Sequence, residues 1–232
     1  MLTLRKSEER GHVNHGWLDS YHTFSFGSYY DPQHMGFRHL RVINQDRIVG
    51  GSGFGTHGHR DMEIVSYVVE GGLEHKDSMG NGSILRRGDV QRMSAGRGVT
   101  HSEFNPSATD PGRFLQIWIL PEREGLEPGY EEKHFSDERK QNRLCPIVSR
   151  DGREDSLHIH QDVTIYASLL DRDVELMHTV AANRYGWVQV VAGDLQINDL
   201  KLTAGDGAAI KAPGELRLQA LSPAEFLVFD LA

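Results

Sequence analysis

Two short segments of the sequence combine the residue types that bind transition metals in proteins. The first contains His57-Gly-His59, and the second contains His101-Ser-Glu103. Residues two apart in an extended strand project from the same face, so each segment predicts a pair of side chains that point together. Two neighbouring strands of this kind would present three imidazoles and one carboxylate to a common point.

A donor set of three histidines and one carboxylate suits several divalent metals. Mixed nitrogen and oxygen ligands accept Fe, Mn, Ni, Cu or Zn, and this set resembles the facial iron site of oxygenases with one histidine added. It leaves coordination positions open for water or substrate, which is typical of a catalytic metal. A lone His-x-His pair is more often an ordinary polar stretch of strand, but the second pair at the same spacing favours a metal site.

Short strands are the elements that must position these side chains. The 25 glycines lie at turn-like positions, and helical periodicity is hard to find. Apolar runs bounded by Gly, Pro, Asn or Asp indicate strands at 40–43, 64–69, 114–119, 188–191 and 226–229. The sequence therefore predicts an all-β protein.

A repeated unit predicts two similar lobes. Residues 66–93 and 187–210 both read strand, glycine turn, strand, Gly-Asp turn, strand. Two such copies favour two double-sheet β-barrel lobes, because closing the sheets leaves no long free edges. When Gly193 is aligned with Gly71, Thr179 and Ala181 fall where the first lobe has His57 and His59, so we expect the second lobe to lack the metal site.

A turn-rich segment lies between the two copies of the repeat. Residues 121–137 carry Pro121, Gly125, Pro128 and Gly129 among charged residues, and this composition interrupts strand pairing. We therefore place the boundary near residue 130. The predicted domains are a metal-binding domain at 1–130 and a degenerate domain without the metal site at 131–232.

Composition and charge exclude several classes of partner. A chain of 232 residues, 38% of them hydrophobic, can bury a sizeable core. The net charge of -8 and the lack of any Lys/Arg-rich run argue against direct nucleic-acid binding. No apolar stretch approaches the roughly 20 residues that span a bilayer, so no membrane partner is expected. The single cysteine, Cys145, and a start without an apolar signal core predict a cytoplasmic protein without disulfides.

The spacing of glycines and histidines resembles the two sequence motifs of cupins. The first motif has a glycine, a His-x-His pair and a following glutamate, and the second ends in a glycine, a histidine and an asparagine. The matching residues are Gly51, His57, His59 and Glu63 for the first motif, and Gly98, His101 and Asn105 for the second.

Among cupins, the sequence is most similar to the pirin family. The likeness covers most of the chain and is carried by GHVNHGWLDSYHTFSF at 11–26, HKDSMGN at 75–81 and MSAGRGVTHSEFN at 93–105. The resemblance implies a fold of two cupin lobes and one metal ion, often iron, held by His57, His59, His101 and Glu103. Glu63 is the rival acid, because other cupins use the equivalent residue and an unbroken strand would place it on the face of the two histidines. The pirin likeness favours Glu103, with Glu63 behind the ligands.

The resemblance also implies an activity, since some pirins are called bacterial quercetinases. It implies a metal-dependent dioxygenase that cleaves a flavonol such as quercetin with O2 and releases carbon monoxide, a quercetin 2,3-dioxygenase. Neutral imidazoles would hold the metal, and Glu103 would both ligate it and act as the catalytic base. Fe(II) is the expected ion, and Zn, Mn, Ni, Cu and Co remain candidates.

Two other functions would retain the same ligands. Some pirin relatives are iron-binding regulatory proteins, so the resemblance also allows a co-regulator of transcription or a partner of a metabolic enzyme. Any transcriptional effect would then act through a protein partner. An isomerase or another non-redox cupin would use Zn or Mn in the same cage without oxygen. The sequence does not separate these functions from the dioxygenase.

The remaining histidines and aromatic residues are assigned mainly structural roles. We interpret His158-Ile-His160 as an alternating strand, because no second His/Glu pair follows it. The hairpin loop that begins at His75 and ends at Asn81 is assigned no chemistry. Packing or pocket lining is expected for His12, His15 and His22, and either core packing or the wall of an aromatic-substrate pocket for Phe24, Phe26, Phe54 and Phe104.

Overall fold

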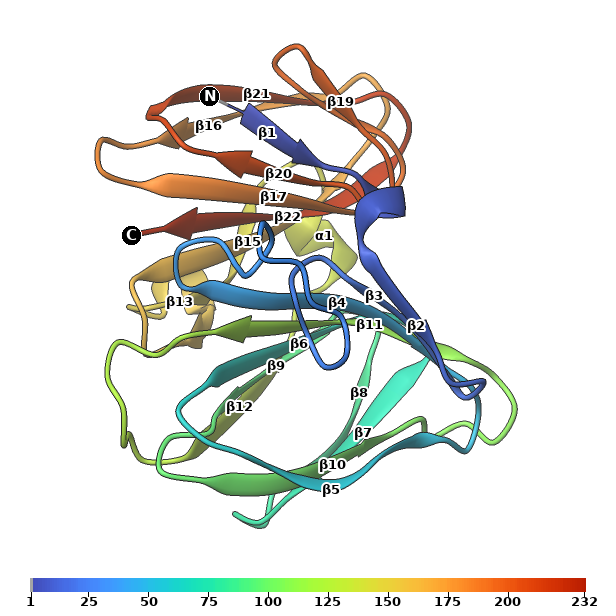
Figure 1. Ribbon diagram of the computed structural model, residues 1–232. Coiled ribbons are helices and arrows are strands. Elements are labelled where there is room, and N and C mark those ends of the chain that lie inside the picture. Colours follow the sequence, from blue (N-terminus) through green and yellow to red (C-terminus); the bar gives the residue numbers. More distant parts are fainter. Residues whose placement is uncertain (1) are drawn as a thin grey trace. The chain divides into compact units, whose positions relative to one another are not determined.

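The computed structural model describes residues 2–232, which form two compact units built almost wholly of strands (Figure 1). The first, here called the histidine unit, comprises Gly11–His134 and Leu157–Gln161. The other, here called the second unit, comprises 2–10, Phe135–Ser156 and Asp162–Ala232. The predicted all-β architecture with two double-sheet lobes is confirmed. These units are defined by contacts, whereas the domains at 1–130 and 131–232 were predicted from the sequence repeat. Those domain boundaries stay a prediction.

Two antiparallel sheets build the histidine unit. The larger has the strand order β12-β9-β6-β11-β4-β3-β2, and the smaller has the order β5-β10-β7-β8. The strands of these sheets are β2 (Gly11–Asn14), β3 (Leu18–His22), β4 (Leu40–Ile48), β5 (Gly53–His59), β6 (Glu63–Glu70), β7 (Gly72–Asp77), β8 (Gly82–Arg86), β9 (Asp89–Ser94), β10 (Val99–Phe104), β11 (Gly112–Ile119) and β12 (Gly129–His134). The unit also contains β14 (Leu157–His158), which belongs to neither sheet.

The centre of the larger sheet gives the histidine unit its rigid core. Strand β11 pairs along its length with β4 on one side and β6 on the other. Phe114 and Ile117 on β11 and Ile64 on β6 are almost completely buried. Burying a side chain of this size stabilises the folded state by about 1.5–3 kcal/mol.

Strand β10 occupies the position that matters for the candidate ligands, between β5 and β7 in the smaller sheet. His101 lies opposite His57 on β5 and opposite Asp77 on β7. Glu103 lies opposite His75 on β7. The pairing of β10 with β5 shifts register between His101 and Glu103, so the strand is irregular between the two. The predicted arrangement of two neighbouring strands carrying the two pairs is confirmed.

The second unit also contains two antiparallel sheets and three short helical segments. Its sheets have the orders β1-β20-β17-β22-β15-β13 and β16-β21-β18-β19. The strands are β1 (Leu2–Arg5), β13 (Cys145–Ser149), β15 (Val163–Leu170), β16 (Glu175–Val180), β17 (Tyr185–Ala192), β18 (Leu195–Ile197), β19 (Leu200–Leu202), β20 (Gly207–Ile210), β21 (Gly214–Ala220) and β22 (Ala224–Leu231). The helical segments are η1 (Ser7–Glu9), α1 (Asp137–Lys140) and η2 (Arg153–Asp155).

The predicted repeat is confirmed by matching turns in the two units. Gly71 joins β6 to β7 with φ +71°, and Gly193 joins β17 to β18 with φ +74°. A side chain at either position would overlap a neighbouring backbone carbonyl, that of Pro111 in one unit and that of Pro223 in the other. Both turns need glycine because the left-handed region and the close approach exclude a Cβ atom.

The interior of the second unit is filled by apolar side chains. Alternate residues of β17, β21 and β22 pack into one cluster, among them Val188, Leu218 and Phe226. Strand β1 completes the sheet by pairing with β20, so the blue first strand lies beside a red late strand in Figure 1. Within residues 2–232, no helix has the length and apolar character needed to cross a membrane.

The close approach of β5 to β10 predicts different effects for two glycine substitutions on the same strand. A Cβ atom at Gly53 would overlap the carbonyl oxygen of Glu103, whereas one at Gly58 would meet only ordinary contacts at 3.8 Å. We expect Gly53→Ala to destabilise the protein by about 1–3 kcal/mol because the strands must separate. Gly58→Ala should change the free energy of unfolding little. Urea unfolding of both variants measures the difference, and equal stabilities would contradict this packing.

Candidate metal centre

Three histidine rings converge at the inner face of β5 and β10. Ring nitrogens of His57, His59 and His101 all lie within 4.8 Å of one another. The Nε2 atoms of His57 and His101 are 3.1 Å apart. Two metal–nitrogen bonds of about 2.1 Å at a right angle would place their nitrogens roughly 3 Å apart. The spacing therefore suits adjacent ligands of one ion.

The orientation of the His57 ring leaves one nitrogen available to a metal. Its Nδ1 lies 2.8 Å from the backbone carbonyl oxygen of Gly55. A carbonyl can only accept, so Nδ1 carries the hydrogen and donates it. The lone pair is then on Nε2, the nitrogen that faces His101. This short backbone contact explains why the strand presents a histidine in the metal-binding tautomer.

Burial keeps the other two imidazoles neutral. Burial, with a smaller contribution from the nearby His57, lowers the pKa of His59 to about 4 and that of His101 to about 3. Both rings are consequently unprotonated at neutral pH. Metals bind neutral imidazole, because the protonated ring has no free lone pair.

Glu103 brings a buried carboxylate to the same region. It forms a second group of candidate ligand atoms with His101 and His75, so it is linked to the three histidines through His101. The Nε2 atom of Gln116 donates to its Oε2 at 2.8 Å, and the Ser66 hydroxyl lies 3.4 Å from its Oε1. Burial raises the pKa of Glu103 to about 7, although both hydrogen bonds act to lower it.

The chemistry of this donor set suits a divalent cation. A carboxylate that burial has pushed to a high pKa gains from a positive charge beside it, because the charge offsets the cost of removing it from water. Three neutral imidazoles supply further electron pairs without adding charge. His57, His59 and His101 thus form one group of candidate ligand atoms, and Glu103 belongs to a second group that shares His101.

Glu63, the rival acid, is engaged elsewhere in the histidine unit. It begins β6 in the larger sheet, whereas His57 and His59 end β5 in the smaller one. Its Oε2 accepts hydrogen bonds from the Ser94 hydroxyl at 2.9 Å and from the backbone N–H of His160 at 3.2 Å. Among residues 2–232, the groups of candidate ligand atoms do not include it.

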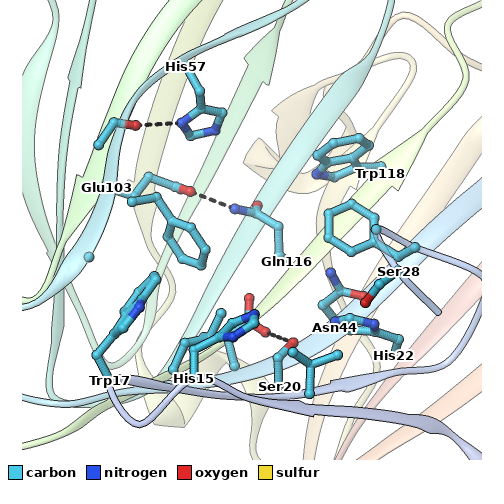
Figure 2. Close-up of a pocket in the computed structure, with 18 of the residues that line it drawn as sticks. His15, Trp17, Ser20, His22, Ser28, Asn44, His57, Glu103, Gln116 and Trp118 are labelled. Carbon is cyan, nitrogen blue, oxygen red and sulfur yellow. Dashed lines mark hydrogen bonds between the residues drawn. The ribbon is translucent and has the colours of Figure 1, made fainter.

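A cavity of about 540 Å³ opens beside these residues, and His59 is part of its lining. His57 and Glu103 line it as well (Figure 2). Most of the wall is apolar. The aromatic side chains that form it are Trp17, Phe26, Phe54 and Trp118. The expectation of an aromatic wall therefore holds for Phe26 and Phe54, whereas Phe24 is buried in the core and Phe104 is 37% exposed.

Polar residues that the sequence analysis did not single out line the same cavity. Asp46 and Asn44 on β4 lie there with Gln116 on β11. The pKa of Asp46 is raised to about 7, mainly by burial and to a smaller extent by the charge of Glu103, while the hydrogen bond donated by the Ser20 hydroxyl acts to lower it. The signal was present in the sequence, because Asn44 and Asp46 take inward positions of a strand that otherwise buries apolar residues.

The N-terminal histidines divide between the cavity and the surface. His15 and His22 line the cavity together with Trp17. His12 instead lies 2.6 Å from Asp19 through its Nε2 and stacks on Tyr21, with the ring centroids 4.4 Å apart. The predicted roles in pocket lining and packing are confirmed.

The second His-x-His pair is part of the scaffold. The backbone N–H of His158 donates to a carboxylate oxygen of Glu131 at 3.0 Å, as that of His160 does to Glu63. The two rings contact each other edge to face, with centroids 4.7 Å apart. In the part of the chain that the structure describes, neither histidine belongs to a group of candidate ligand atoms.

Comparison with known families agrees with this geometry. The model of the family named Pirin matches residues 3–119, and the model named Quercetinase C-terminal cupin domain matches residues 146–231. The chain belongs to the pirin family. Both of its lobes are therefore cupins, as the sequence motifs predicted for the fold.

Several pirins resemble the whole chain. A protein of Escherichia coli K12 named quercetin 2,3-dioxygenase is 51% identical over 231 residues, which cover 100% of this chain and 99% of that protein. A putative quercetin 2,3-dioxygenase of Pasteurella multocida is 43% identical and covers 100% of both chains. The crystal structure of the pirin YhhW from Escherichia coli in complex with nickel(II) matches with a TM-score of 0.95 at 49% identity, covering 100% of this chain and 99% of that one.

The raised pKa of Asp46 predicts a pH-dependent effect of Asp46→Asn in metal-free protein. The folded state holds the proton more tightly than the unfolded state, so the stability contributed by Asp46 falls as pH rises from about 4 to about 7. Asparagine does not ionise, so the Asp46→Asn variant does not lose this stability as the pH rises. We expect Asp46→Asn to gain stability over the parent at pH 8, by at most about 4 kcal/mol, and to gain little at pH 4. Thermal unfolding at both pH values in the presence of a chelator tests this; an equal difference at the two values would contradict it.

Proposed function

We propose that this pirin is a metal-dependent dioxygenase that cleaves a flavonol such as quercetin, using one divalent ion held by His57, His59, His101 and Glu103. The observation that carries the proposal is the opening of the histidine cluster into an aromatic-walled cavity. Relatives named quercetin 2,3-dioxygenase support the substrate class, and the nickel(II) complex of a similar pirin supports a divalent metal. Fe(II) is our first choice of metal, and the donor set also accepts Ni, Mn, Co, Cu and Zn.

The three histidines would hold the metal as neutral donors, beside the cavity that His57 and His59 line. When bound, the metal supplies Lewis-acid and redox chemistry for the reaction between the flavonol and O2. His57 is held by the Gly55 carbonyl, and burial keeps His59 and His101 unprotonated. These rings therefore present electron pairs without needing to lose a proton first.

The aromatic wall orients a planar substrate against the ligands. Trp118 contacts His59 edge to face with ring centroids 5.0 Å apart, and Phe26 contacts Trp118 in the same way at 5.3 Å. On the other side, Trp17 and Phe54 are 5.2 Å apart. Edge-to-face pairs hold each ring in place, and cavities of roughly 300–1,000 Å³ take ligands of the size of a flavonol.

Glu103 is the residue we assign to accept the proton of the substrate's enolic hydroxyl. Burial raises the pKa of Glu103 to about 7 in the metal-free protein, so a Glu103 carboxylate that is not ligated to the metal accepts a proton readily. Gln116 donates to Oε2 and thereby fixes the carboxylate while leaving it an acceptor. The same carboxylate is the fourth ligand in this proposal, so ligation and proton acceptance compete for its oxygen atoms.

Loss of one ligand should remove both metal and activity. We expect His57→Ala to lower bound metal and to reduce kcat/KM for quercetin by more than about 100-fold, because the remaining donors no longer enclose the ion. Glu103→Gln keeps the shape of the side chain but removes its charge and basicity, so turnover should fall further than metal content does. Metal per chain, quercetin absorbance and oxygen uptake are measured on anaerobically reconstituted protein.

The matched control is His158→Ala, which removes a histidine from the second His-x-His pair. It should bind metal and turn over quercetin as the parent does. Metal bound by the parent without turnover of any flavonol would contradict the dioxygenase and favour the iron-dependent interaction protein. Turnover by metal-free parent protein would contradict the proposed site itself.

Variants of two phenylalanines on adjacent strands distinguish a residue that contacts the substrate in the cavity from one that does not. Phe54 on β5 lines the cavity, whereas Phe104 on β10 is 37% exposed. We expect Phe54→Ala to raise KM for quercetin roughly tenfold, because burial of an aromatic side chain against the substrate contributes on the order of 1–3 kcal/mol. Phe104→Ala should leave KM near the parental value. Steady-state kinetics of both variants checks this, and an equal rise in KM would rule out the proposed wall.

A further inference from the structure

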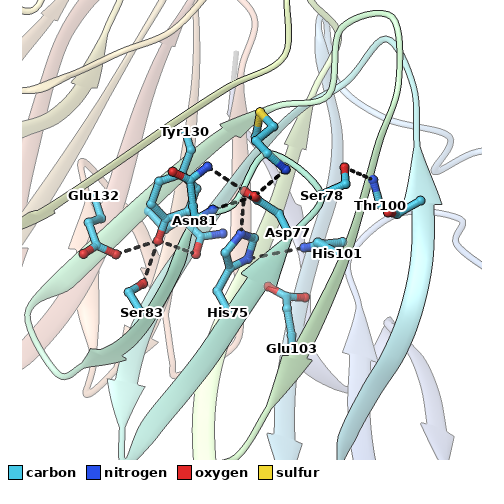
Figure 3. A network of polar contacts seen from close by, with 12 residues as sticks. His75, Asp77, Ser78, Asn81, Ser83, Thr100, His101, Glu103, Tyr130 and Glu132 are labelled. Atoms are coloured by element: carbon cyan, nitrogen blue, oxygen red, sulfur yellow. Dashed lines mark hydrogen bonds and ion pairs between the residues drawn. The ribbon is translucent and has the colours of Figure 1, made fainter.

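A buried pair of residues lies directly behind His101. His75 on β7 is fully buried, and its Nδ1 lies 3.4 Å from the Nδ1 of His101 (Figure 3). The other ring nitrogen of His75, Nε2, lies 3.1 Å from Oδ2 of Asp77. Asp77, His75 and His101 thus form a continuous chain of hydrogen bonds that ends at the cluster of candidate ligands.

The Asp77 carboxylate is fixed in one orientation. Its Oδ1 accepts the backbone N–H groups of Met79 and Asn81 at 2.9 and 3.0 Å. Its Oδ2 accepts the side-chain amide of Asn81 at 2.9 Å, beside His75. An ionised carboxylate can only accept hydrogen bonds, so this end of the chain has a defined direction.

That direction determines the position of every proton in the chain. Because Asp77 accepts, the Nε2 of His75 carries a hydrogen and its Nδ1 is an acceptor. His101 completes the chain by carrying its hydrogen on Nδ1 rather than donating from Nε2 to the Nε2 of His57, 3.1 Å away. The lone pairs on the two Nε2 atoms then face each other, an arrangement that a cation between them stabilises. We propose that Asp77 and His75 are positioning residues that hold His101 in the tautomer that binds the metal. The inference rests on the metal site of the proposed function.

Packing around His75 prevents its ring from turning to another partner. Tyr130 stacks on it with ring centroids 4.9 Å apart and planes at 23°. The Tyr130 hydroxyl is itself held 2.8 Å from the Ser83 hydroxyl. His75 also groups with His101 and Glu103, but both of its nitrogens are already engaged. The group is therefore better explained as support for His101 than as a second metal cage.

Asp77→Asn is the decisive variant, because it keeps the turn and reverses the direction of the chain. The amide oxygen can still accept the backbone N–H groups of Met79 and Asn81. The amide nitrogen replaces Oδ2 and donates to His75 and, once the Asn81 side-chain amide turns over, to the Asn81 oxygen. His75 then carries its hydrogen on Nδ1, and His101 is left with its hydrogen on Nε2. We expect nickel(II) affinity to fall roughly 10- to 100-fold, the effect typical of residues behind metal ligands.

His75→Phe keeps the stack on Tyr130. It removes the Nδ1 acceptor that faces His101 but does not put a donor in its place. His101 is then free to adopt either tautomer, so nickel(II) affinity should fall by a smaller factor than in Asp77→Asn. Ser78→Ala is the control for damage to the same loop. The Ser78 hydroxyl accepts the backbone N–H of Thr100 at 3.1 Å and is not part of the hydrogen-bond chain from Asp77 to His101. Its nickel(II) affinity should equal that of the parent.

Two measurements distinguish the outcomes. Isothermal titration calorimetry measures nickel(II) affinity, and ¹⁵N chemical shifts of the His101 ring in metal-free protein at neutral pH report which nitrogen carries the hydrogen. The expected result is hydrogen on Nδ1 in the parent and on Nε2 in Asp77→Asn. An unchanged tautomer, or an unchanged affinity in a parent that binds nickel(II), overturns this inference. A parent that fails to bind nickel(II) overturns the proposed metal site, while the ring shifts still decide the tautomer.

Discussion

An imidazole ring has two nitrogen atoms, and a metal site works only if the hydrogen is on the right one. In the proposed site, the position of β10 between β5 and β7 meets this requirement for His101, because His75 on β7 faces its Nδ1 and His57 on β5 faces its Nε2. His57 meets it locally, through a carbonyl two residues away. The geometry of the site therefore depends on a three-strand register, and the close contact of Gly53 with β10 shows how tightly that register is held.

Much of the fold and half of the site follow from local patterns in the sequence. Two-residue spacing predicted that His57 and His59 share a face, and the repeated glycine turns predicted two lobes. Both signals depend only on residues close together in the chain. Glu63 was harder to place, because it is four residues after His59 and an unbroken strand would put both side chains on the same face. The structure separates them by ending β5 at His59 and beginning β6, in the other sheet, at Glu63.

The parts that sequence patterns missed depend on pairing between distant strands. His75 and Asp77 have the same two-residue spacing as the predicted pairs, but they lie at the end of β7 next to a loop and were interpreted as part of that loop. Their role appears only when β7 is placed against β10, so that His75 lies opposite Glu103 and Asp77 opposite His101. No local pattern specifies that register, because it is set by which strands neighbour each other. Gln116 was missed for the same reason, whereas Asp46 had a local signal, its inward position on a strand that otherwise buries apolar residues.

Matching positions in the two lobes hold polar side chains in one lobe and apolar side chains in the other. In the histidine unit, Ser66 on β6 pairs with Gln116 on β11, and both contact the carboxylate of Glu103. At the matching place in the second unit, Val188 on β17 pairs with Val228 on β22 within the apolar core. Polar groups are costly to bury unless each finds a partner. Ser66 and Gln116 find theirs in each other and in Glu103. The cost of burying Glu103 is offset when a cation lies beside it, which is the role of the proposed metal. Val188 and Val228 bury no polar side chain and need no such partner.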